Sequence, residues 1–136
     1  MKEIGWTGFS VDLARTPLTA MGQTLFEPPD VNGWEPGVGW FSTGAMLARM
    51  NFASTLASNQ RFNLGREAQA ARGSAENMLS LFLDRMSPAP YDGPPYDALL
   101  TYLRTGASWP PSDTLLTTKA AGLARLIAGS SEYQFM

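Results

Sequence analysis

The chain has 136 residues and contains neither cysteine nor histidine. The lack of cysteine excludes disulfides and is compatible with either an oxidising or a reducing compartment. Together the two absences remove the most common general base, the thiol nucleophile and the usual zinc ligands. A Ser-His-Asp triad cannot form within this chain. The sequence therefore offers no catalytic constellation, and we predict neither a cofactor nor a metal site.

Charged residues are also scarce, at 16% of the chain, where about 25% is typical. The net charge is −2 and no basic run is present, so nucleic acid is not an expected partner. No apolar run approaches the roughly 18 residues of a membrane span, and the first residues lack the apolar core of a signal peptide. The charge deficit predicts that part of the surface packs against an N-terminal region of a longer protein, a second copy or a ligand.

Apolar residues at helical spacing predict an all-α fold of five or six helices. Cap and stop residues set the expected boundaries of these helices. The expected helices are two short ones between Ser10 and Met21, separated at Pro17, followed by residues 42–57, 74–86, 95–104 and 114–128. The expected N-caps are Ser10, Thr16, Ser42 or Thr43, Ser74 and Ser112, and Gly22 is an expected stop. The expected apolar stripes are Met78, Leu79, Phe82, Leu83 and Met86 in 74–86, and Leu116, Ala120, Leu123 and Ile127 in 114–128. We treat residues 1–136 as a single helical domain, with a hinge predicted in the polar segment 58–73.

The helix at about 42–57 is expected to be the centre of the fold. Its apolar stripe repeats at helical spacing and includes Met46, Met50 and Ala53. Arg49 lies at the edge of this stripe, where a half-buried guanidinium needs polar partners. We expect those partners in the preceding loop, which offers carboxylates and free backbone carbonyls.

That loop, residues 22–41, is long and rich in proline, glycine and aromatic residues. Pro28 and Pro29 exclude a regular helix or a central strand through it. Disordered segments are poor in aromatics, so an ordered loop is expected. In one interpretation, the aromatic side chains of Phe26, Trp34 and Trp40 are buried and fix the loop to the helices. In the other, Trp34 or Trp40 is a stacking platform for a glycan. The first is favoured because large aromatics are more often core residues.

Three carboxylates, Glu27, Asp30 and Glu35, share this loop with the indoles. Paired carboxylates beside aromatic rings are typical of glycoside-cleaving sites. Acidic residues that cap turns or pair with Arg49 would give the same pattern, and we favour that interpretation. The candidate ligand-binding set is therefore Trp34, Trp40, Glu27, Asp30 and Glu35.

The loop and the helix after it carry a recognisable motif. It reads Gly22-Gln23-x-Leu25-Phe26-x-Pro28-Pro29-x-Val31-x-Gly33-Trp34, then Trp40, then Leu47-Ala48-Arg49-Met50-Asn51-Phe52-Ala53. This motif resembles the C-terminal part of the DUF1800 family. The end of the chain, from Gly129 to Gln134, resembles the closing motif of the same family, with Ser131 where proline is usual. We assign a structural role to the motif residues Gln23, Phe26, Pro28, Pro29, Asp30, Gly33, Trp34, Trp40 and Arg49.

The resemblance implies a C-terminal part, or a short relative, of bacterial proteins that are several times longer and often exported, which points to the periplasm or the exterior. The family has no settled activity, so no catalytic residue is carried over. We therefore predict a structural, interaction-mediating helical domain that contacts the N-terminal region of a longer protein or a second copy. We expect an exposed apolar patch near residues 1–20. The alternatives are a glycan-binding module and part of a carboxylate hydrolase site that an N-terminal region completes.

Overall fold

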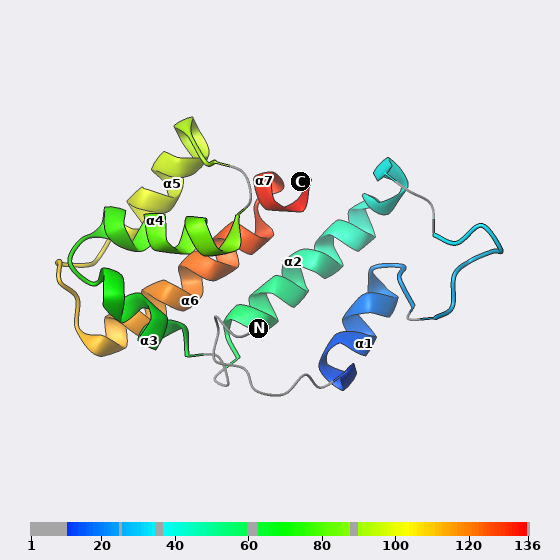
Figure 1. The fold of residues 1–136 in the computed structure, drawn as a ribbon, viewed down its shortest axis with the longest axis horizontal. Helices are drawn as coiled ribbons and strands as arrows, with labels where there is room; N and C mark the ends of the chain where they lie inside the picture. The colour runs from blue at the N-terminus through cyan, green and yellow to red at the C-terminus, as the bar shows by residue number, and fades with distance from the viewer. Residues whose placement is uncertain (1–10, 25, 35–36, 60–62, 88–89, 136) are drawn as a thin grey trace. The chain divides into compact units, whose positions relative to one another are not determined.

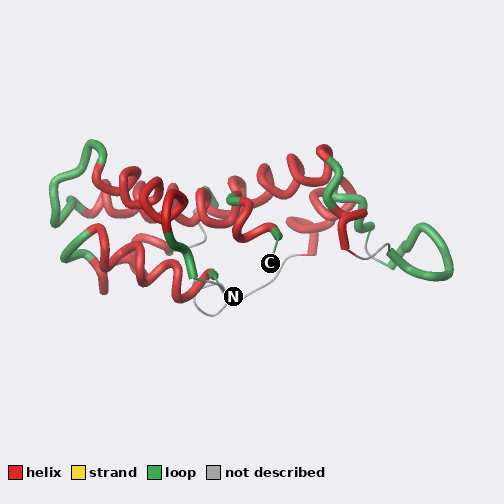
Figure 2. The backbone as a smooth tube through the Cα atoms, turned by 90° about the horizontal axis from the view of Figure 1, so that it is seen from above, coloured by secondary structure: helices red, strands yellow, loops and turns green. Residues whose placement is uncertain are grey.

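The computed structural model describes residues 11–24, 26–34, 37–59, 63–87 and 90–135. These residues form helices and loops without a strand, which confirms the all-α prediction (Figure 2). None of the helices in the described ranges has the length and apolar character needed to cross a membrane. The chain divides into two compact units, one within residues 8–55 and one over residues 56–136.

The unit within residues 8–55 begins with helix α1 (Val11–Ala20), which contains Pro17. The prediction of two short helices separated at this proline is wrong. A proline removes one backbone donor from a helix, and here the helix continues past it with Ala14 and Met21 buried. The proposed cap at Ser10 and half of the expected patch at residues 1–20 lie outside the described residues.

Gly22 ends α1 in the way the sequence predicts. Its φ is +77°, in the left-handed region that glycine adopts at little cost. The amide of Gly22 donates to the Thr19 carbonyl at 3.0 Å, and the amide of Gln23 donates to the Leu18 carbonyl at 2.8 Å. These two bonds form a Schellman motif, which satisfies carbonyls that the end of the helix leaves free.

Helix α2 (Thr43–Ala57) follows a 3-10 turn, η2 (Gly37–Trp40), and matches the predicted range. The Ser42 hydroxyl accepts a hydrogen bond from the Ala45 amide at 3.2 Å and caps the helix. Ala45 and Ala53 are buried, but Met50 of the predicted stripe is 47% exposed. The stripe is thus only partly covered within its own unit.

In the unit over residues 56–136, the helices pack around α6 (Asp113–Gly129). Helix α6 contacts the other four α-helices of the unit (Figure 1), which are α3 (Leu64–Ala68), α4 (Ala75–Met86), α5 (Gly93–Arg104) and α7 (Ser131–Gln134). A short 3-10 turn, η3 (Gln69–Ala71), extends α3. The expectation that the 42–57 helix is the centre of the whole fold stays a prediction, because α6 is the centre of this unit alone.

The predicted apolar stripes of α4 and α6 form the core of this unit. On α6 the stripe residues Leu116, Ala120, Leu123 and Ile127 are all fully buried. On α4, Met78, Leu79 and Phe82 are buried with them in one cluster. Burial of apolar area at about 25 cal/mol per Å² is the main stabilising term for such a cluster.

Serine caps set the starts of these two helices as the sequence predicts. The Ser74 hydroxyl accepts from the Asn77 amide at 3.1 Å, and the Ser112 hydroxyl accepts from the Leu115 amide at 3.3 Å. Helix α5 begins at Gly93, two residues before the predicted start at Pro95.

The second half of the segment 58–73 packs into this core. Residues 64–71 are helical, and Leu64, Ala68 and Ala71 are buried members of the cluster. Whether the segment acts as a hinge stays a prediction.

Two glycines bring helices unusually close together. A Cβ on Gly65 would lie 3.0 Å from the Thr117 Cβ and 3.2 Å from the Thr117 Cα. A Cβ on Gly122 would lie 2.6 Å from the Tyr102 Cζ. The contact of α3 with α6, and of α5 with α6, therefore depends on the absence of a side chain at these positions.

Candidate functional site

The loop motif is the first place to look for a functional site. Phe26 has a φ of +64° and is 88% exposed, so the prediction that it plugs the core is wrong. The backbone amide of its neighbour Glu27 donates a hydrogen bond to the Thr24 carbonyl at 3.1 Å, which closes a turn. The phenyl ring is thus exposed at a position with positive φ, which hydrophobicity alone does not indicate.

A second turn follows at Asp30. Its Oδ1 accepts from the Asn32 amide at 2.7 Å, and its carbonyl accepts from the Gly33 amide at 3.1 Å. The carboxylate therefore shapes the backbone, as Asx turns do. Val31, at the tip of this turn, is fully exposed.

The predicted ligand-binding residues are only partly placed by the structure. Trp34 is half-buried, and its indole Nε1 is buried without a hydrogen-bond partner among the described residues. Glu27 and Asp30 are exposed, and neither forms an ion pair with a described residue. Glu35 and the Trp40 side chain lie outside the described part.

Among the described residues, Arg49 contacts the loop through an aromatic ring and not through a carboxylate. Its guanidinium Cζ lies 5.1 Å from the centre of the Phe41 ring, at the loop's last residue. Nη1 also lies 3.8 Å from the Met46 sulfur. A stacked guanidinium of this kind contributes about 0.5–1 kcal/mol at an exposed site. The predicted pairing with Glu27 or Asp30 is absent among the described residues. The Phe41 ring is the loop group that the guanidinium contacts instead.

A groove of about 380 Å³ lies between α1 and α2. Both helices contribute small or apolar side chains, and every residue that lines the groove is uncharged. Leu47 of α2 lines it and is 58% exposed. Leu13 and Pro17 face it from α1. The described lining thus offers no charged side chain to pair with a charged ligand.

Among its described residues, the 8–55 unit leaves several large apolar side chains exposed, and one of them, Leu47, also lines the groove. We call this set the apolar surface of the 8–55 unit; its members are Phe26, Val31, Leu47 and Met50. Residues 8–55 contain six charged side chains. The low charge and the uncovered apolar groups occur in the same part of the chain.

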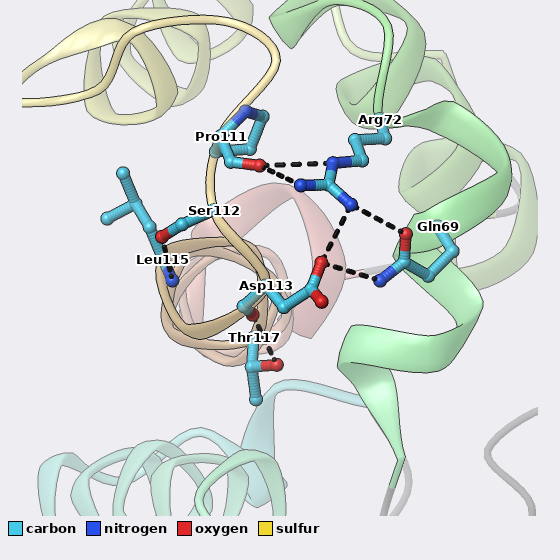
Figure 3. A network of polar contacts seen from close by, with 7 residues as sticks. All are labelled: Gln69, Arg72, Pro111, Ser112, Asp113, Leu115 and Thr117. Carbon is cyan, nitrogen blue, oxygen red and sulfur yellow. Dashed lines mark hydrogen bonds and ion pairs between the residues drawn. The ribbon is translucent and has the colours of Figure 1, made fainter.

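The polar contacts of the other unit are structural. Arg72 donates through Nε and Nη2 to the Pro111 carbonyl, at 3.0 and 2.6 Å, and through Nη1 to the Asp113 carboxylate at 2.7 Å (Figure 3). Gln69 adds a bond to the same carboxylate at 3.3 Å. The network joins the end of η3 to the start of α6.

Lys119 is a buried cation that was not predicted from the sequence. It is 8% exposed, and its Nζ donates to the carbonyls of Tyr102 and Thr105, each at 2.7 Å. Nζ also lies 4.5 Å from the centre of the Tyr102 ring. The lysine thereby satisfies free carbonyls at the C-terminal end of α5. Its place three residues after Leu116, on the buried stripe, was the available sequence signal.

In a comparison with protein families, residues 7–135 match the family described as "Protein of unknown function (DUF1800)". The chain belongs to the DUF1800 family. The resemblance read from the loop and closing motifs is thus confirmed. No curated protein and no solved structure matched the chain.

The closing motif of this DUF1800 chain forms α7. Ser130 caps the helix by accepting from the Tyr133 amide at 3.3 Å. Its hydroxyl also lies 2.5 Å from the Tyr91 hydroxyl, so one serine joins the helix cap to the segment before α5. Gln134 donates to the Ala128 carbonyl at 2.6 Å and holds α7 against the end of α6.

Proposed function

We propose that this DUF1800 chain is a structural, interaction-mediating helical domain that binds another polypeptide through the apolar surface of its 8–55 unit. The single observation that supports this most is the exposure of Leu47 and Met50 on α2. Both belong to the stretch that resembles the family motif, and both are large apolar side chains at 58% and 47% exposure. An exposed apolar set of this kind marks interaction sites on soluble proteins.

The polypeptide we propose is the N-terminal region of a longer DUF1800 protein. The resemblance implies that such proteins are several times longer than this chain. The uncharged lining of the α1–α2 groove suits an apolar helix, which would add i, i+3 and i+4 side chains to it. In this view the low overall charge reflects surface that is covered in the longer protein.

The test measures the mass of the isolated chain in solution by light scattering across a concentration series. Without its partner, the apolar surface is expected to pair with a second copy, so the parent chain should associate at high concentration. The double variant Leu47→Glu with Met50→Glu should remain monomeric with an unchanged melting temperature, because exposed apolar residues contribute little to stability.

Leu126→Glu is the matched control, since Leu126 is also an exposed large apolar residue, at 42%, but belongs to α6. It should associate like the parent. A parent chain that is monodisperse and monomeric at high concentration would contradict the proposal, as would a Leu126→Glu variant that behaves like the double variant.

The alternatives remain predictions with tests of their own. A glycan-binding module would retain the parent chain on a polysaccharide resin and lose this retention in Trp34→Ala. A hydrolase site completed by an N-terminal region would show activity in the longer protein that Glu27→Gln or Asp30→Asn removes.

A further inference from the structure

A pocket of about 430 Å³ lies where α4 ends and α5 begins. Ser80 and Asp84 line it from α4, and Ser87 lines it at the C-cap of that helix. Tyr91 and Tyr96 line it from the following segment and from α5. Its volume is within the range of sites that hold small ligands, which begins at about 300 Å³. Among the described residues of the lining, Asp84 carries a charge.

The position of Asp84 in α4 is electrostatically unfavourable for a carboxylate. It lies in the last turn of α4, where the helix dipole is negative and cations are favoured. It forms no ion pair and no hydrogen bond with a described residue. The basic residue of that turn, Arg85, pairs instead with Glu67 at 2.6 Å. Asp84 is solvent-exposed, and its carboxylate has no ion-pair partner among the described residues.

The aromatic side of the pocket is held in place. Tyr91 is 8% exposed, and its hydroxyl is bonded to the Ser130 hydroxyl at 2.5 Å. Burial raises the pKa of Tyr91, and the charge of Glu132 raises it further against the effect of the Ser130 hydrogen bond. A second carboxylate, that of Glu132, thus acts on this region. Tyrosine rings attract cations through their faces.

We propose that this pocket binds an organic cation with a primary ammonium group, with Asp84 as counter-charge and Tyr91 and Tyr96 as aromatic walls. The hydroxyl of Ser80 supplies an acceptor for a further ammonium proton. A neutral or anionic ligand of the same size would form no charge pair with the Asp84 carboxylate. This site lies in the 56–136 unit and does not depend on the interaction surface of the 8–55 unit.

The test is a titration of the folded chain with n-butylammonium at low ionic strength, followed by amide NMR. Saturable shifts are expected at residues 84, 87, 91 and 96. The matched ligands 1-butanol and butyrate have the same carbon chain without the positive charge and should give no saturable shift. Asp84→Asn should weaken n-butylammonium binding about fivefold, and Tyr96→Leu should weaken it about threefold.

Asp97→Asn is the control variant, because Asp97 is an exposed acid of α5 that does not line the pocket, and its affinity should equal that of the parent. A rise in salt to about 1 M should weaken binding to the parent by screening the charge pair. Equal binding of 1-butanol or butyrate, undiminished binding to Asp84→Asn, salt-independent binding, or no saturable shift at all would overturn the proposal.

A blocked lysine, N-acetyl-lysine N-methylamide, distinguishes the two sources of such a group. Tighter binding than n-butylammonium indicates a lysine side chain displayed by a polypeptide, and weaker binding indicates a free amine. Either result supports the site only if Asp84→Asn weakens both ligands.

Discussion

At the scale of single residues, Arg72 connects two segments that lie far apart in the sequence. Its side chain makes two bonds to the Pro111 carbonyl and one to Asp113, and Pro111 is fully buried. We expect Arg72→Met, which keeps the apolar stem, to lower the free energy of unfolding by about 1.5–3 kcal/mol, the range for hydrogen bonds to charged groups. Urea unfolding measures this change.

Arg104→Met is the control for Arg72→Met. Arg104 pairs with Glu76, and both side chains are well exposed, so its loss should change stability by less than about 1 kcal/mol. If the two substitutions lower the free energy of unfolding equally, the hydrogen bonds to the Pro111 carbonyl add no more stability than an exposed ion pair.

Gly65 tests how closely α3 and α6 pack. At an open helical position, Gly→Ala stabilises by about 0.5–1 kcal/mol. At Gly65 the added methyl would meet Thr117, including its backbone Cα at 3.2 Å, so we expect a loss of about 1–3 kcal/mol in the unfolding free energy.

Two further variants define the origin of the Gly65 effect. Gly73→Ala meets nothing within 4 Å and should stay within about 0.5 kcal/mol of the parent. Thr117→Ala combined with Gly65→Ala should recover part of the loss, because it removes the Thr117 hydroxyl. A Gly65→Ala variant as stable as the parent would contradict the close packing.

Single residues were predictable where local chemistry determines them. Gly22, Ser42, Ser74 and Ser112 act as stops or caps because a helix end needs the same groups in any fold. Phe26 and Lys119 were not predictable from type alone. A turn with positive φ leaves the phenyl ring exposed, and carbonyls at the end of a distant helix offset the burial of the ammonium.

At the scale of elements, α7 offers a test of the family motif. Ser131 occupies the first helical position after the Ser130 cap, where proline is favoured. Ser130 has φ −75° and ψ 155°, which a following proline allows. We expect Ser131→Pro to raise the unfolding free energy by about 0.4–1 kcal/mol by restricting the unfolded chain.

The control for this element is Ser131→Ala, which removes the hydroxyl without fixing φ. It should lack the stabilisation, as measured by thermal unfolding of all three chains. Destabilisation by Ser131→Pro, with the alanine variant unchanged, would mean that the first turn of α7 does not have the geometry described.

Helices with a complete stripe and a cap were predicted well, and α4 and α6 show this. Helix α1 was predicted as two helices. A proline within a helical pattern does not show whether tertiary packing keeps the helix continuous across it. The start of α5 was missed by two residues for a similar reason, since Gly93 begins the helix at a position where sequence favours a turn.

At the scale of the whole molecule, the sequence predicted the fold class but not the assembly of the helices. Four α-helices meet at α6 through contacts between residues distant in sequence, such as Gly65 with Thr117. The pocket beside Asp84 has the same origin, since residues of α4 and α5 build it together with Ser87, Pro90 and Tyr91. The loop carboxylates suggested a ligand site because they are close together in the sequence. In the structure, the Asp30 carboxylate instead shapes a turn.

The central claim is that the apolar surface of the 8–55 unit binds the N-terminal region of a longer DUF1800 protein. Calorimetric titration of that region into this chain at several temperatures tests it most directly. The account predicts binding with a negative heat-capacity change, which marks burial of apolar surface. Leu47→Glu should abolish this binding, and Leu126→Glu should retain it. No binding by the parent chain, or binding that Leu47→Glu leaves intact, would contradict the account.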